Sequence, residues 1–204
     1  MKKTFLSIIS ALFIASSVNA ADLTFGVSAA YTKIDGSGTE TARESGEVNN
    51  GDANNNVAIG SIFVENNFGN FSLGIDFIPF TADVSNKVKS RSDTNSEGDT
   101  GTYTAQAEIS KHLTIYALYP FSNGAFVKAG VARVDVETKE NLNSGSTYGD
   151  ATVYGGQIGL GYSKDNWRLA LEYTDYQTIS LTSDANNIVK ADLDTTALKL
   201  SYNF

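Results

Sequence analysis

The residues best suited to catalysis lie around the single histidine of the chain, His112. Glu108 and Ser110 precede it at two-residue spacing, so on a regular β-strand the three side chains would share one face. A serine nucleophile needs its base within ~2.6–3.2 Å, whereas same-face neighbours on one strand lie ~6.5–7 Å apart. One strand cannot assemble this triad by itself. We therefore predict no catalytic site and keep a hydrolase as the least favoured alternative.

The composition excludes several other kinds of site. The chain has no cysteine, which excludes disulfides, thiol catalysis and cysteine-ligated metals. Its 23 acidic residues outnumber 15 basic ones, which disfavours sequence-nonspecific binding of nucleic acid. The oxygen-rich segments 52–54 and 93–99 do not match the spacing of a calcium loop. We predict no metal, no cofactor and no nucleic-acid partner.

Residues 1–20 have the features of a secretory signal peptide. Lys2 and Lys3 precede an apolar stretch over 5–15, and a small residue, Ala20, ends the segment. We predict cleavage there and a single mature domain over 21–204. Export of a cysteine-free chain favours a Gram-negative envelope protein.

The mature chain alternates apolar and polar residues with period two, which is typical of half-buried strands. The pattern predicts eight strands, all of which except 102–119 come near the ~9–11 residues of a tilted membrane strand. They cover 22–34, 56–67, 71–80, 102–119, 125–137, 152–163, 167–177 and 193–204. Within 125–137 the apolar phase shifts from Val131 to Val134, which predicts a β-bulge near Ala132 and Arg133.

Short and long connections alternate strictly between these strands. The short ones are 66–70, 120–124 and 163–166, and the long, polar ones are 35–55, 83–101, 138–151 and 180–191. Such alternation is typical of an antiparallel up-and-down transmembrane β-barrel with short periplasmic turns and long extracellular loops. The first long connection is acidic, and we expect the external loops to be mobile.

Two features indicate which strand face meets lipid. The polar faces carry charges of both signs at mid-strand, which could neutralise one another across a narrow lumen, with Glu65 as a further candidate. The predicted lumen network is Asp76, Glu108, Lys128, Arg168, Glu172 and Lys199. Aromatic residues collect at both ends of the apolar face, as in the interfacial girdles of membrane barrels. These are Phe25, Tyr31, Phe71, Phe77, Tyr103, Tyr119, Tyr154, Tyr162, Trp167 and Tyr173. A soluble lipocalin-like barrel would instead hold its apolar face inside.

The last predicted strand carries Leu198, Leu200, Tyr202 and Phe204 at alternate positions. This ending resembles the assembly signal of bacterial outer-membrane proteins. With the eight strands and the signal peptide, residues 22–204 resemble the small OmpA/OmpX-like barrels, without the periplasmic peptidoglycan-binding domain of OmpA-type proteins. The resemblance implies a monomer in the outer membrane, with lipopolysaccharide, other outer-membrane lipids and the assembly machinery as its partners.

An eight-stranded barrel has an interior that side chains can fill. The sequence therefore favours a structural or surface-interaction protein with a plugged polar lumen and no catalysis. A narrow ion channel or loop-gated small-solute transporter is the second hypothesis. A soluble, secreted lipocalin-like binder and an outer-membrane lipid hydrolase remain as further alternatives.

Overall fold

A computed structural model describes residues 23–41, 46, 48–84, 91–92, 100–101, 106–139, 147–183 and 186–204. The predicted signal peptide and Tyr103 lie outside these residues. Among them, no helix long and apolar enough to cross a membrane is found.

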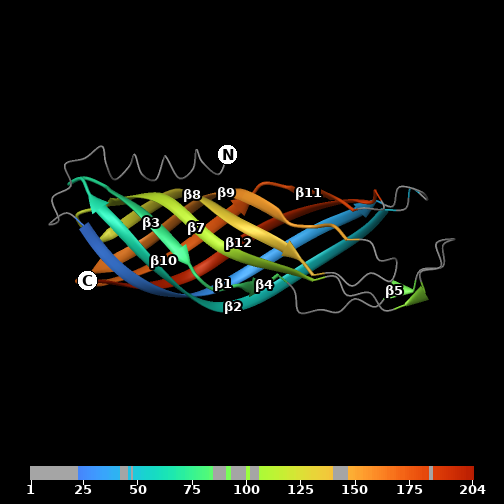
Figure 1. Ribbon diagram of the computed structural model, residues 1–204. Coiled ribbons are helices and arrows are strands. Elements are labelled where there is room, and N and C mark those ends of the chain that lie inside the picture. The colour runs from blue at the N-terminus through green and yellow to red at the C-terminus, as the bar shows by residue number, and fades with distance from the viewer. Residues whose placement is uncertain are drawn as a thin grey trace.

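The chain forms a closed, all-β, eight-stranded antiparallel barrel, which confirms the predicted fold class (Figure 1). Its wall consists of β1 (Leu23–Thr41), β2 (Val48–Asn67), β3 (Ser72–Ile78), β7 (Ala107–Pro120), β8 (Ala125–Thr138), β9 (Ala151–Lys164), β10 (Trp167–Tyr176) and β12 (Ile188–Asn203). Neighbours pair in this order, and β1 pairs with β12 to close the wall. Two short strands add to it, β4 (Ala82–Asp83) on β7 and β11 (Ile179–Thr182) on β12. A separate two-stranded ladder joins β5 (Arg91–Ser92) and β6 (Thr100–Gly101).

Three tight turns join neighbouring strands at one end, between β2 and β3, β7 and β8, and β9 and β10. At the other end, the prediction of a loop over 35–55 is wrong for most of its length. β1 and β2 continue as a paired ribbon to Thr41 and Val48, with Asp35 opposite Asn54. The predicted loop 180–191 likewise contains paired segments of β11 and β12. These segments look like loops because they are polar, but an antiparallel sheet with a solvated outer face needs no apolar residues there.

The predicted β-bulge near Ala132 and Arg133 is also wrong, because β8 alternates without interruption. The irregularity lies on the neighbouring strand β7, where Ser110 pairs with Asp135 but Leu113 pairs with Arg133. Two β7 residues, Lys111 and His112, therefore oppose one β8 residue. Lys111 has a φ of 50°, in the left-handed region.

The apolar phase shift in β8 marks a change in the barrel interior rather than a bulge. Toward the turns, exposed apolar side chains such as Val127 and Val131 cover the outside, while Lys128 points inward. Toward the open end the arrangement reverses, so that Val134 and Val136 become interior residues. They belong to the upper core, an apolar cluster that also contains Ile34, Val84, Ile109, Ala132, Val153, Tyr176, Ile179 and Leu193.

The outer surface changes at the same height. On β1, exposed Phe25, Val27 and Tyr31 give way to the ion pair Lys33–Asp35, with 2.7 Å between Nζ and Oδ2. Charged side chains are unfavourable beside lipid tails. The barrel therefore has a lower storey with an apolar outside and a polar lumen, and an upper storey with a polar outside and an apolar core.

Candidate functional site: a blocked lumen and the cavity above it

Four buried charges from four different strands meet inside the lower storey. Lys199 Nζ lies 2.5 Å from Asp76 Oδ2 and 3.8 Å from Glu172 Oε2, and Lys128 Nζ lies 2.7 Å from Glu172 Oε1. Relative exposure of the four side chains does not exceed 9%. Ser61 Oγ donates a further hydrogen bond of 3.2 Å to Asp76. Four of the six charges predicted for the lumen thus form one continuous network.

A second group lies beside the first, at the lumen face of β2, β7 and β10. Arg168 Nη1 is 2.5 Å from Glu65 Oε1, which also accepts a 2.7 Å hydrogen bond from the Tyr116 hydroxyl. The ammonium of Lys128 lies 4.0 Å from the centroid of the Tyr116 ring, a cation–π contact that links the two groups. We call the seven side chains of both groups the lumen plug: Glu65, Asp76, Tyr116, Lys128, Arg168, Glu172 and Lys199. Its three cations balance its three carboxylates.

The sixth predicted lumenal charge, Glu108, is not in the lumen. The bulge at Lys111 shifts β7 by one residue, so Glu108 lies on the outer face of the upper storey and forms an ion pair with Lys139. The same shift divides the candidate catalytic residues. His112 lines the interior, whereas Ser110 faces outward and donates a 3.3 Å hydrogen bond to Glu137. The shared strand face on which a triad would depend does not exist.

Inward-pointing aromatic rings also fill the lumen, and the period-two pattern did not single them out. A Cβ at Gly26 would lie 2.1 Å from the Phe63 ring, one at Gly74 2.4 Å from Tyr116, and one at Gly161 2.3 Å from Phe126. These glycines therefore leave space for rings on neighbouring strands. In the sequence, a glycine on the polar face of one strand opposite an aromatic residue on the next strand would have indicated this packing.

The predicted girdle residues in the described part of the chain lie on the outer surface. Eight of them are exposed by 37% or more, whereas Tyr154 is half-buried. The exposed ones are Phe25, Tyr31, Phe71, Phe77, Tyr119, Tyr162, Trp167 and Tyr173. At the last strand, Leu198 and Leu200 also face outward, and the Tyr202 ring packs edge-on against Trp167 and Phe204.

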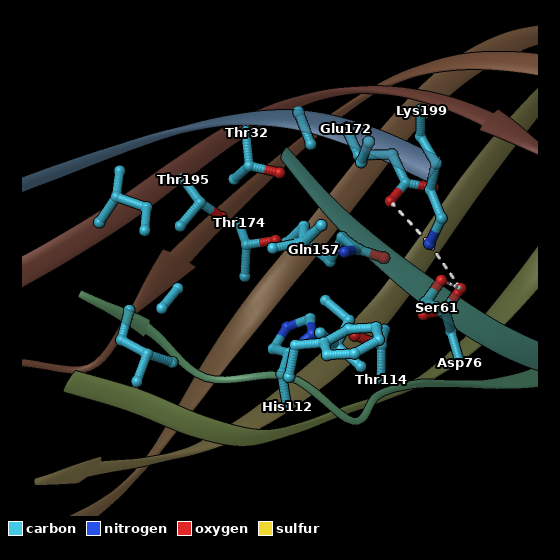
Figure 2. A pocket seen from close by; sticks show the side chains of 18 of the residues that line it. Thr32, Ser61, Asp76, His112, Thr114, Gln157, Glu172, Thr174, Thr195 and Lys199 are labelled. Atoms are coloured by element: carbon cyan, nitrogen blue, oxygen red, sulfur yellow. Dashed lines mark hydrogen bonds and ion pairs between the residues drawn. The ribbon is translucent and has the colours of Figure 1, made fainter. Parts of the chain in front are cut away.

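A cavity of about 70 Å³ lies between the lumen plug and the upper core. Figure 2 shows Lys199 with Glu172 and Asp76 at one end, and His112, Thr114 and Gln157 turned toward one another nearby. Ile34, Ile59, Ile109 and Tyr176 contribute apolar walls.

Four buried side-chain polar atoms in the described residues have no hydrogen-bond partner, and all four belong to residues lining this cavity. They are Thr32 Oγ1, His112 Nδ1, Thr114 Oγ1 and Gln157 Oε1. Buried polar groups are rarely left without a partner. The cavity is therefore a place where water or a ligand would complete the bonding. No group of three or more acidic or histidine residues in the described chain is arranged to hold a metal ion.

No family model and no curated protein sequence matches the chain. Several solved outer-membrane proteins share its fold. Neisserial surface protein A aligns with a TM-score of 0.51 and 11% identity over 90% of this chain and 97% of its own. Outer membrane protease OmpT from Escherichia coli aligns at 0.53 and 12% over 93% and 99%. Outer membrane protein AlkL aligns at 0.52 and 18% over 89% and 90%. At these identities the likeness shows the β-barrel fold alone, and the neighbours differ in role.

Proposed function

We propose that the protein is a monomeric outer-membrane barrel of a Gram-negative envelope that has a structural or surface-contact role and does not conduct along its axis. The observation that carries the proposal is the lumen plug, whose six charges are paired across the width of the lower storey. Breaking a buried ion pair costs roughly 3–5 kcal/mol, so a transient axial opening is unfavourable. The apolar outer band and the outer-membrane fold of the neighbours support location in that membrane, in contact with lipopolysaccharide and other lipids.

The alternatives have less support. A lipocalin-like soluble binder would need an apolar lumen, whereas here the apolar surface faces outward over the lower storey. A hydrolase centred on His112 lacks its partners, because Ser110 lies on the opposite side of the wall. The protease activity in OmpT's name belongs to that protein.

Planar-bilayer recording tests the proposal. We expect purified wild-type protein to give no discrete openings. The double variant Asp76→Ala/Lys199→Ala removes one ion pair without leaving a net charge and is expected to give leak currents. These currents serve as the positive control, because they show that the recording detects protein inserted in the bilayer. Discrete openings in the wild-type protein would overturn the proposal and favour the narrow channel instead.

A further inference from the structure

The barrel wall is incomplete beside the cavity, between β2 and the chain that follows β3. The β2–β3 ladder runs from Asn67 opposite Ser72 up to Ile62 opposite Phe77, and stops there. Beyond that point β3 ends at Ile78, and the next strand, β4, pairs with β7. No backbone hydrogen bond joins 57–61 to 78–83 among the described residues. We call this break the lateral gap.

A side-chain bond closes the gap at its upper end, and an aromatic ring covers its lower part. Asn55 Nδ2 donates a 2.7 Å hydrogen bond to the carbonyl oxygen of Asp83. Lower down, the Phe80 ring lies against Gly60, where a Cβ would be 3.5 Å from it. Gly60 and Phe80 both line the cavity, and Phe80 is 59% exposed on the outside. The ring therefore lies between the cavity and the surroundings of the barrel.

The lower part of the gap lies at the height of the membrane. Gly60 pairs with Ala29 on β1, two residues below the exposed girdle residue Tyr31. Unpaired, irregular backbone is tolerated at membrane depth only where it is buried in protein or lines a water-filled cavity. The segment around Pro79, a residue without an N–H group, meets this condition because the cavity lies directly behind it.

The lining defines the chemistry of an occupant. Most of the wall is hydrocarbon, from Ile34, Ile59, Ile78 and Ile109. The free polar atoms at Thr32, His112, Thr114 and Gln157 offer hydrogen bonds but no net charge, since the neighbouring plug charges are paired with one another. A cavity volume of roughly 10–15 Å³ is enough to hold one water molecule. The volume of about 70 Å³ therefore suits several waters or one small organic molecule.

We propose that the cavity binds small, uncharged, mostly apolar molecules that carry one hydrogen-bonding group, such as phenols, and that they enter through the lateral gap from the outer leaflet. The plug below and the upper core above close the axial directions, while Phe80 covers the gap. This proposal extends the function above, because it concerns a route through the wall rather than along the axis.

Binding of para-fluorophenol to the protein in lipid nanodiscs, followed by fluorine NMR line broadening, tests the site. We expect saturable broadening beyond that of empty nanodiscs. Thr114→Val, which removes one free hydroxyl at nearly constant volume, is expected to weaken phenol binding by about tenfold, the equivalent of one hydrogen bond. It should leave the binding of fluorobenzene unchanged. Absence of saturable binding to the wild-type protein would overturn the proposal.

Two variants at the gap test the route. Gly60→Trp places a large ring at the gap and is expected to abolish probe exchange on the NMR time scale, whereas Phe80→Ala uncovers the gap and should accelerate it. Gly156→Trp is the matched control, since Gly156 lies on the outer face of β9 with open space beside it. Heat-modifiable migration verifies folding of each variant. Equal exchange in Gly60→Trp and Gly156→Trp, or unchanged exchange in Phe80→Ala, would overturn lateral entry.

Discussion

At the scale of single residues, the lumen plug depends on pairing rather than on the number of charges. Lys199 lies between Asp76 and Glu172, and all three side chains are buried. A buried pair contributes little net stability against a well-packed apolar substitute, but losing one partner leaves a charge without compensation in a medium of low dielectric constant. The sequence predicted these residues as interior because each falls at mid-strand on a polar face. It could not identify their partners, which lie as far as 123 positions apart.

Lys199→Met is therefore expected to destabilise the barrel by roughly 3–5 kcal/mol, because Asp76 loses its only buried cation within 4 Å in the described structure. The double variant Lys199→Met/Asp76→Leu removes both charges and should regain much of that loss. Lys164→Met, at an exposed position, is the control. The midpoint of heat-modifiable migration in detergent measures the three effects, and a double variant no more stable than the single one would contradict the pairing argument.

At the scale of elements, the bulge in β7 changes which residues face the lumen in a way that the period-two pattern does not predict. A continuous alternation through Glu108, Ser110 and His112 predicts one shared face, but a single extra residue at Lys111 inverts the pattern for everything beyond it. Lysine gives no local signal for this, since glycine and asparagine are the residues expected at a positive φ. The apolar phase shift in the β8 sequence does have a structural cause. It marks the change from a polar lumen to an apolar core, and not a β-bulge.

Three neighbouring strands place carboxylates side by side, a few residues above Tyr31 on the outer face of the barrel. Asp194 on β12 pairs with Asp35 on β1 and with Asp175 on β10. Partial burial and these two negative neighbours raise the pKa of Asp194 above its usual value of 3.8, against the lowering effect of Lys33. A raised carboxyl pKa in the folded state means that the ionised form destabilises the fold, and that acidification through this pKa relieves the effect.

Asp194→Asn is accordingly expected to raise the unfolding temperature at pH 7. The advantage over the wild-type protein should shrink as the pH falls through the folded-state pKa of Asp194 toward 3.8, because the wild-type carboxyl then becomes neutral as well. Asp165→Asn, in a turn at the other end of the barrel, is the control and should change neither the unfolding temperature at pH 7 nor its dependence on pH. A stability difference that does not depend on pH would contradict a cause in carboxylate repulsion.

At the scale of the whole molecule, the two storeys explain why the sequence predicted the fold well and the upper part of the barrel poorly. Alternation with apolar residues outside holds only over the lower storey, where the exposed outer side chains are apolar. Beyond Tyr31 the same strands continue with the opposite sense, as Lys33 outside and Ile34 inside show, so their outer residues look like loop residues. The cavity lies between the storeys, where the interior changes character, and a one-dimensional pattern contains no direct signal for such a boundary.

The closing strand allows assembly to be separated from stability. Phe204 is 76% exposed, and its backbone N–H donates a 2.8 Å hydrogen bond to Phe25, which substitution by alanine retains. The Phe204 ring contacts Tyr202 at a centroid distance of 5.3 Å, a contact worth about 0.5–1.5 kcal/mol.

If the ending acts as the assembly signal that it resembles, Phe204→Ala should sharply reduce the amount of barrel recovered from the outer membrane of expressing cells. The unfolding midpoint of refolded protein should change little. Phe121→Ala is the matched control, because this exposed ring at the same end packs at 5.4 Å against Tyr119. Equal losses of membrane-inserted barrel in both variants would assign the effect to lost aromatic packing rather than to recognition of the strand.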